Sequence, residues 1–188
     1  MHCEICSGIF LDPELRLTPE NEKSRYLRHN NDIKDPGYQQ YMQPVVDAIE
    51  KNFKSESKGL DYGAGPGPVV AYMLENKGYN LILFDPFFYP SKEVLASKYD
   101  YITCTEVIEH FYNPLQEFKK LHEMLLPGGR LFCMTNIFSS EINFSKWHYK
   151  NDMTHVFIYA AKTLAFIAET IGFKDITIDD KLITFTKA

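Results

Sequence analysis

The chain has 188 residues, of which 45% are hydrophobic and 24% charged; this composition excludes an intrinsically disordered chain and fits one globular domain. Its formal net charge of -5 at pH 7 excludes the broad positive field that draws proteins to nucleic acid or anionic membranes. No apolar run approaches the roughly 20 residues that span a bilayer, and the first residues lack the layout of a secretory signal. We therefore expect a cytoplasmic protein with neither a membrane nor a nucleic acid partner.

The segment 1–37 is polar and contains turn-forming Asp-Pro and Thr-Pro pairs, so we predict an irregular arm laid over a folded domain at 38–188. Within the arm, Cys3 and Cys6 form a C-x-x-C pair. A tetrahedral zinc site needs four ligands, and His2 is the only other soft ligand close by in sequence. Zinc at this pair is therefore the less favoured alternative to a metal-free arm.

From residue 38 onward, predicted helices and strands alternate. Apolar residues from Tyr38 to Phe53 recur every three or four positions, which is the pattern of a helix packed on a sheet. We predict further helices at 69–78, about 107–125 and 160–171, and strands at 59–62, 81–84, 101–104, 130–134, 176–178 and 182–185. This order predicts an α/β fold: a Rossmann-like open, mostly parallel twisted sheet with helices on both faces and an antiparallel edge hairpin.

The strongest functional signal is the turn Asp-Tyr-Gly-Ala-Gly-Pro-Gly at 61–67, between the first predicted strand and its helix. Glycine lacks the Cβ atom that would hold a ligand away from the main chain. Glycines also make turns that bind nothing, but here Asp85 follows Asp61 by 24 residues, at the end of the next strand. A carboxylate in that place can accept hydrogen bonds from ribose hydroxyls. The spacing G-x-G-x-G differs from the G-x-G-x-x-G of dinucleotide sites, so the pattern indicates a nucleoside site.

The turn resembles the first motif of the class I S-adenosylmethionine-dependent methyltransferases, an acidic residue followed by G-x-G-x-G, and the resemblance covers about residues 38–188. It implies that the glycines cradle the amino acid and ribose parts of the cofactor. It also implies that Asp85 binds the ribose and that Asp61 orders the turn. The cofactor-binding residues expected from this domain are Asp61, Gly63, Ala64, Gly65, Gly67, Asp85, Pro86, Phe87, Thr105 and Glu106.

The connection that follows Asp85 is short. By the same resemblance the adenine lies near Pro86, Phe87 and the segment ending at Leu95. Only about 15 residues separate Asp85 from the next clear strand, whereas a crossover alone ordinarily needs about a dozen. We therefore expect a short strand or loop at 93–95 and a shallow adenine pocket.

Glu106, Glu109 and His110 follow the strand at 101–104, and if a helix begins there they share one face. One interpretation is structural, with Glu106 favouring the positive end of the helix and the other two pairing with neighbours. The stretch also resembles the E-x-x-E-H motif of ubiquinone-pathway O-methyltransferases and small-RNA 2′-O-methyltransferases, in which it carries metal. A divalent ion at these three residues is thus an alternative, and we favour contact with the cofactor methyl region over it.

The segment 147–157 is dense in aromatic and titratable side chains and has no clean helical or strand period. Any one of these residues is explained by packing at the edge of a core. As a group that starts shortly after a strand ends, they suggest a substrate wall. The residues expected to contact substrate are Trp147, Tyr149, Asp152 and His155.

Tyr26 and His29 belong to a second unusual segment, within the arm. This segment, the late loop and 85–88 together resemble a bacterial branch of the methyltransferase superfamily that often carries a zinc ribbon upstream. The resemblance implies that the arm covers the cofactor, with Tyr26 and His29 as lid residues. It also implies that Cys3 and Cys6 are the second half of such a ribbon.

The expected reaction is transfer of a methyl group from S-adenosylmethionine to a small-molecule acceptor, with an oxygen acceptor favoured and S-adenosylhomocysteine as product. An oxygen acceptor must lose its proton and lie in line with the methyl group. His110 and His155 are candidate bases because imidazole titrates near neutral pH, and Glu109 is the third candidate catalytic residue. The alternatives are a non-catalytic nucleoside-binding module and an NAD-type nucleotide-binding oxidoreductase.

Overall fold

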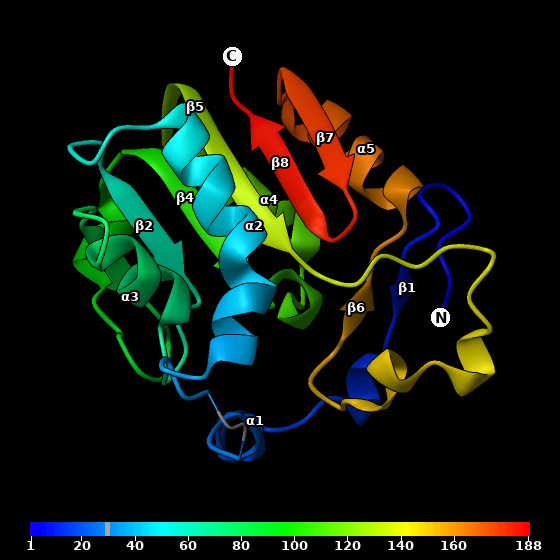
Figure 1. Cartoon of the computed structure of the whole chain (residues 1–188). Coiled ribbons are helices and arrows are strands. Elements are labelled where there is room, and N and C mark those ends of the chain that lie inside the picture. The colour runs from blue at the N-terminus through cyan, green and yellow to red at the C-terminus, as the bar shows by residue number, and fades with distance from the viewer. Residues whose placement is uncertain (29–30) are drawn as a thin grey trace.

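A computed structural model describes residues 1–28 and 31–188 (Figure 1). Its main sheet has six strands in the order β3-β2-β4-β5-β8-β7. The strands are β2 (Gly59–Tyr62), β3 (Leu81–Phe84), β4 (Tyr99–Thr105), β5 (Leu125–Met134), β7 (Asp175–Asp179) and β8 (Leu182–Thr186). The first four are parallel, and β8 runs antiparallel to both β5 and β7. The predicted mostly parallel sheet and its edge hairpin are confirmed.

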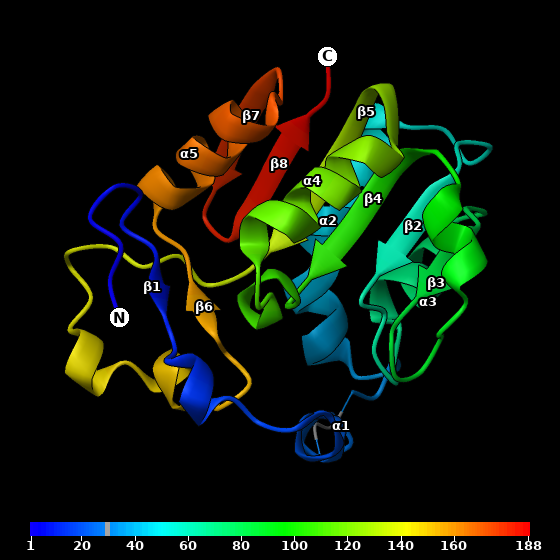
Figure 2. The ribbon, with the colours of Figure 1, turned by 180° about the vertical axis from the view of Figure 1, so that it is seen from behind.

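Helices cover both faces of this sheet (Figures 1 and 2). α2 (Pro36–Asn52) and α3 (Val69–Glu75) pack on one face, and α4 (Pro114–Met124) and α5 (Ala161–Ile171) pack on the other. Adjacent residues of a strand point to opposite faces of the sheet. Tyr101 packs in the hydrophobic cluster under α2 and α3, whereas Ile102 packs in the cluster under α4 and α5. This alternation follows from the two-residue period of a strand. The three-layer arrangement confirms the predicted fold class.

Local sequence explains where α2 begins and which face it buries. Asp35 caps the helix by accepting a hydrogen bond from the backbone N–H of Tyr38 at 2.8 Å, and Pro36 occupies the first turn, where its missing N–H costs nothing. The residues that α2 buries recur at helical spacing: Met42, Val45, Val46 and Ile49. The helix thereby brings the tyrosines of its first two turns to the carboxyl ends of the strands.

The arm is more regular than predicted. β1 (Ile9–Phe10) pairs antiparallel with β6 (Phe157–Ile158), a partner far away in the sequence, and α1 (Pro19–Tyr26) follows it. Thr18 caps α1 through its side chain. The prediction of an irregular arm was wrong because a two-residue strand has no period of its own and depends on its partner. α1 lies beyond the carboxyl ends of β2 and β4 (Figures 1 and 2).

The predicted helix at 107–125 is divided. A single 3₁₀ turn spans Ile108–His110, α4 begins only at Pro114, and β5 already begins at Leu125. Asn113 caps α4 with its side chain, and the backbone of Glu106 has a positive φ of 53°, which no helix accommodates. Glu106, Glu109 and His110 therefore do not share a helical face, and that prediction was wrong.

Short 3₁₀ turns form most of the remaining connections. The segment predicted as a short strand or loop is a 3₁₀ turn at Lys92–Ala96. The others lie at Pro13–Leu15, Phe144–Lys146 and His148–Asn151. Within the described ranges, the structure has no helix whose length and apolar character would allow it to cross a membrane.

Candidate cofactor and acceptor site

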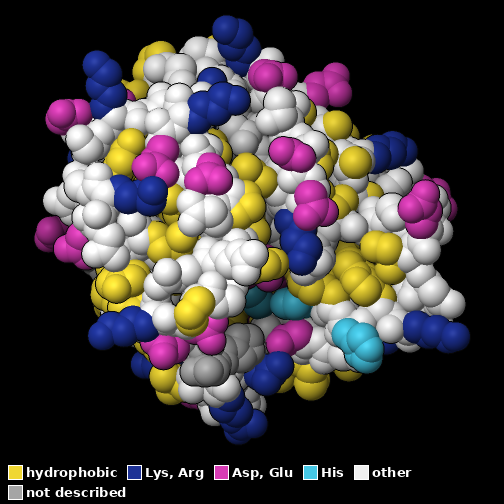
Figure 3. Space-filling view, viewed as in Figure 1, with side chains coloured by type: hydrophobic (Ala, Val, Ile, Leu, Met, Phe, Trp, Pro, Cys, Tyr) yellow, Lys and Arg dark blue, Asp and Glu magenta, His cyan; other side chains and the backbone are white. Residues whose placement is uncertain are grey.

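A cavity of about 760 Å³ opens at the carboxyl ends of β2, β3 and β4. The chain enters β3 on one side of β2 and β4 on the other, so this is the point where the strand order reverses. Open α/β sheets bind ligands at such a point. A volume in the range of roughly 300–1,000 Å³ is usual for small-molecule sites. Figure 3 shows histidine atoms deep in a hollow of the surface.

The glycine turn forms one wall of the cavity. Gly63 has a φ of +82°, and a Cβ atom at that position would lie 2.5 Å from Cγ2 of Val107. A Cβ atom on Gly67 would overlap the backbone carbonyl oxygen of Asn31. Only glycine fits both places, because the first needs a left-handed backbone and both need close approach of another segment. The turn therefore exposes main chain to the cavity.

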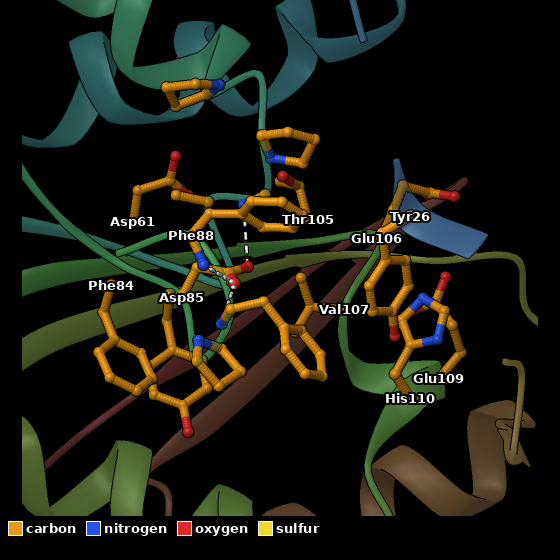
Figure 4. Close-up of a pocket in the computed structure, with 18 of the residues that line it drawn as sticks. Tyr26, Asp61, Phe84, Asp85, Phe88, Thr105, Glu106, Val107, Glu109 and His110 are labelled. Atoms are coloured by element: carbon orange, nitrogen blue, oxygen red, sulfur yellow. Dashed lines mark hydrogen bonds between the residues drawn. The ribbon is translucent and has the colours of Figure 1, made fainter. Parts of the chain in front are cut away.

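Asp85 connects the glycine turn to the loop after β3. Its Oδ2 accepts a hydrogen bond from the Gly65 N–H at 3.0 Å, and its Oδ1 accepts from the N–H groups of Phe87 at 2.8 Å and Phe88 at 3.0 Å. The carboxylate is buried and faces the cavity (Figure 4). Pro86 and Phe87 line the same wall, whereas Leu95 packs on the core between α4 and the sheet.

Asp61 is buried beneath the turn. Its Oδ1 accepts a hydrogen bond from the Thr103 hydroxyl at 2.8 Å, across β2 and β4. Burial raises the pKa of Asp61 to about 6, the Thr103 hydrogen bond opposes that rise, and the charge of Asp85 adds to it. Asp61 therefore orders the end of β2 and leaves negative charge at the floor of the cavity.

Figure 4 shows the residues of the cavity in two groups, with Asp61 and Asp85 on one side and Glu106, Glu109 and His110 on the other. We call the second group, with His155, the acidic end of the cavity.

Glu106 is the first residue of the acidic end and directly follows β4. Its N–H donates to the Met134 carbonyl at 2.8 Å, and its Oε1 accepts from the Tyr41 hydroxyl at 2.9 Å. Burial raises the pKa of Glu106 to about 8, and the negative charge of Glu109 raises it further. The hydrogen bond from Tyr41 and the positive charge of Lys181 act in the opposite direction and lower this pKa.

Glu109 is 0% exposed and lines the cavity. Its Oε1 accepts a hydrogen bond from the Tyr149 hydroxyl at 2.6 Å, and that hydroxyl also lies 2.6 Å from the hydroxyl of Thr135. Its Oε2 has no hydrogen-bond partner among the described residues. A buried carboxylate oxygen without a partner is costly, so this atom marks a place for a donor or a cation.

The two histidines of the acidic end make the same kind of contact, in which Nδ1 faces a backbone carbonyl oxygen. Nδ1 of His110 lies 2.8 Å from the Thr154 carbonyl oxygen, and Nδ1 of His155 lies 2.7 Å from the Tyr149 carbonyl oxygen. Because a carbonyl only accepts, both Nδ1 atoms carry the proton, and each Nε2 is left with its lone pair in the neutral ring. Burial lowers the pKa of His155, and Glu109 opposes that effect.

One group of described residues could hold a metal ion. Glu109, His110 and His155 each offer a ligand atom within 4.8 Å of the others, and the backbone contacts of both Nδ1 atoms are those that orient metal-binding histidines. Glu106 is not part of this group; its Oε1 accepts a hydrogen bond from Tyr41. Cys3 and Cys6 are not in any such group within the described ranges.

The arm closes the acidic end through Tyr26. The Tyr26 ring lies edge-on to the ring of His110 at a centroid distance of 5.4 Å and 6.0 Å from that of Phe87. Its hydroxyl donates to Glu22 at 2.7 Å. Arg25 forms an ion pair with Asp152 at 2.7 Å, which ties α1 to the late loop. His29, the other predicted lid residue, lies outside the described residues.

Of the four residues predicted to contact substrate, His155 lines the cavity and the other three do not. Tyr149 holds Glu109, and Trp147 packs on the Tyr149 ring at 5.0 Å. Sequence reasoning also missed two lining tyrosines, Tyr38 and Tyr41. Both lie in the first turns of a helix that packs on the sheet, and that position was a usable signal.

Solved methyltransferases share this fold. An O-methyltransferase family protein from Burkholderia thailandensis superposes with a TM-score of 0.59 at 12% identity, covering 88% of this chain and 61% of that one. Magnesium protoporphyrin IX methyltransferase from Synechocystis PCC 6803, solved with bound S-adenosylhomocysteine, superposes with a TM-score of 0.57 at 13% identity and covers 91% and 95%. At these identities the likeness shows the fold alone, which is the Rossmann-like α/β fold of these methyltransferases.

Sequence comparison gives the family. Residues 35–178 match the family model described as a methyltransferase domain, so the chain belongs to this methyltransferase family. Ubiquinone biosynthesis O-methyltransferase from Histophilus somni is 31% identical over 81 residues, and that from Serratia proteamaculans is 29% identical over 77 residues. Each match covers 41% of this chain and only about a third of the relative, 34% and 32%.

Proposed function

We propose that the protein binds S-adenosylmethionine in the cavity and methylates an oxygen atom of a small-molecule acceptor. The observation that carries this proposal is the arrangement of the cavity, in which an exposed main-chain turn and a carboxylate face a cluster of imidazoles and a buried carboxylate. The matched ubiquinone O-methyltransferases support an oxygen acceptor. Within the described residues, no arginine and only one lysine, Lys120, lines the cavity, which favours an acceptor without a strong negative charge.

The cofactor assignment rests on residues that line one continuous surface. S-adenosylmethionine would supply an electrophilic methyl group, and the chain supplies the walls that hold it. The proposed cofactor residues that line the cavity are Tyr26, Asp61, Gly63, Ala64, Gly65, Gly67, Asp85, Pro86, Phe87, Thr105 and Glu106. Oδ1 of Asp85 already accepts two backbone N–H groups, whereas Oδ2 accepts one and keeps a lone pair, so the side chain can still accept a hydrogen bond from a ribose hydroxyl.

His155 is the first candidate for the base that takes the proton from the acceptor hydroxyl. His155 lines the cavity with Nε2 unprotonated in its neutral form, so this atom can accept the proton of an acceptor hydroxyl. The resulting imidazolium would lie beside Glu109, whose negative charge stabilises it. His110 offers the same arrangement and is the second candidate base. A divalent ion held by Glu109, His110 and His155 is the alternative, and there both imidazoles would be ligands.

Calorimetry tests the cofactor assignment before any acceptor is known. S-adenosylmethionine and S-adenosylhomocysteine should each bind with one site per chain, and NAD should give no heat. Asp85→Asn should weaken both about 10-fold or more, because it removes charge from the ribose contact, whereas Asp100→Asn, which removes a carboxylate that caps the Lys58 N–H, should not. Folded protein that binds neither adenosyl compound would refute the proposal.

The base assignment needs turnover, measured as S-adenosylhomocysteine released with a panel of phenols and catechols. His155→Gln should lower the rate about 100-fold or more if this imidazole takes the proton. His148→Gln is the matched control, because His148 does not line the cavity. Adding Mg²⁺, Mn²⁺ or Zn²⁺ to chelator-treated protein separates the two mechanisms: restoration of activity by metal would favour the metal alternative.

A further inference from the structure

We propose that Glu106 and Glu109 make the acidic end of the cavity selective for a cation, so that the site binds charged S-adenosylmethionine in preference to neutral S-adenosylhomocysteine. This inference rests on the proposed function. The two compounds share the adenosine and amino acid parts and differ by one methyl group and one positive charge at sulfur. Preference between them must therefore come from the region that faces the sulfur.

The charges at the acidic end do not balance within the described lining residues. Glu106 and Glu109 are carboxylates that line the cavity, and Lys120 is its one lysine. Lys120 lies elsewhere, with Nζ 5.1 Å from the centre of the Tyr62 ring and 3.7 Å from Glu117 Oε2. No lysine or arginine among the described lining residues reaches the acidic end. A cation bound there would be attracted by the Glu109 carboxylate and would also stabilise the ionised form of Glu106, whose pKa burial raises to about 8.

Each carboxylate is held by one phenol hydroxyl, Tyr41 for Glu106 and Tyr149 for Glu109. A hydroxyl supplies a hydrogen bond but no positive charge. Lys181 also acts on Glu106, but from outside the cavity, where its ammonium lies over the Tyr41 ring at 4.8 Å. Two carboxylates that are buried close together repel one another, and that repulsion is relieved when a cation enters.

An independent observation shows that the end is incomplete without a ligand. Glu109 is 0% exposed and lines the cavity, yet its Oε2 has no hydrogen-bond partner among the described residues. Such an oxygen loses its water without gaining a donor. A buried carboxylate oxygen of this kind is expected where a ligand completes the site.

The consequence for the reaction is a change of affinity on turnover. Before methyl transfer the site holds a ligand with a positive sulfur, and afterwards it holds one without that charge. The same carboxylates that favour binding of the cofactor then contribute little to binding of the product. Product release is thereby favoured without any movement of the glycine turn.

The test compares dissociation constants by calorimetry at pH 9, above the raised pKa of Glu106 of about 8, in a buffer containing EDTA. Wild-type protein should bind S-adenosylmethionine more tightly than S-adenosylhomocysteine. Glu106→Gln keeps the shape of the side chain and should weaken S-adenosylmethionine about 10-fold while leaving S-adenosylhomocysteine within about 2-fold. Glu117→Gln is the matched control, because Glu117 also lines the cavity and also accepts from a tyrosine, Tyr62; it should leave the ratio of the two constants unchanged.

A third ligand keeps the test independent of any variant. Sinefungin carries a protonated amine in place of the sulfonium and should bind wild-type protein more tightly than S-adenosylhomocysteine. An unchanged ratio of constants in Glu106→Gln would overturn the inference, as would sinefungin binding no better than the neutral product. A wild-type preference that appears only when EDTA is left out of the buffer would assign the selectivity to a metal and overturn the inference too. If neither adenosyl compound binds, the proposed function itself fails.

Discussion

Gly63→Ala is the substitution whose cost the structure defines best. Alanine at a φ of +82° carries a left-handed penalty of roughly 1–2 kcal/mol. Its Cβ would also lie 2.5 Å from Cγ2 and 2.8 Å from Cγ1 of Val107, where ordinary contacts begin at 3.4 Å. Forcing a packed side chain aside costs a further 1–3 kcal/mol, approximately. The total is about 2–5 kcal/mol, or a fall in Tm of roughly 5–15 °C for a chain of this size.

Thermal and urea unfolding of matched variants can separate the two terms. Gly78→Ala has a similar φ of +86° with nothing within 4 Å of the new Cβ, so it should show only the backbone penalty of about 1–2 kcal/mol. Val107→Ala removes both offending methyl groups, and the double variant should therefore lose less stability than the sum of the single variants. If Gly63→Ala is no more destabilising than Gly78→Ala, the reasoning about close approach is refuted.

Three further predictions follow from other contacts. The pKa of Glu106 rises from 4.5 to about 8 on folding, so the native protein holds this proton more tightly than the unfolded chain does. The free energy of unfolding of the wild-type protein should therefore fall as pH rises from 5 to 9, by up to roughly 5 kcal/mol. Urea unfolding at pH 5, 7 and 9 checks this, and an equally steep fall in Glu106→Gln would contradict it. Tyr149→Phe leaves the Glu109 carboxylate without its donor, and unfolding should show a loss of about 1–3 kcal/mol; Tyr99→Phe, whose hydroxyl binds the Val94 carbonyl, should lose less. Arg25→Ala breaks a partly exposed ion pair with Asp152 and should change stability by no more than about 1 kcal/mol, while proteolysis within α1 should become faster if that pair ties the arm down.

The spacing of residues along the chain was enough to predict the layers of the fold. The apolar period of α2, the strand at 81–84 and the glycine turn are all local patterns, and local patterns report the period of an element and the residues that end it. Asp85 could be placed for the same reason, because the carboxyl ends of parallel strands meet at one edge of a sheet. These features required no knowledge of distant contacts.

The sequence singled out the residues of the acidic end, but not their geometry. The expected helical face of Glu106, Glu109 and His110 does not form, because the Glu106 N–H pairs with Met134 on the neighbouring strand while its backbone adopts a positive φ. Tyr149 was expected to touch substrate, yet the structure places it behind Glu109 as a hydrogen-bond donor.

Local patterns were sufficient to predict the sheet, most of its helices and the nucleoside-type turn, since each depends on residues a few positions apart. Long-range packing sets which carboxylate Tyr41 and Tyr149 each hold, the pairing of β1 with β6, and the meeting of His155 with Glu109 and His110. Those contacts join segments from 40 to almost 150 residues apart. Their geometry is set by how whole elements pack, and spacing along the chain does not record it.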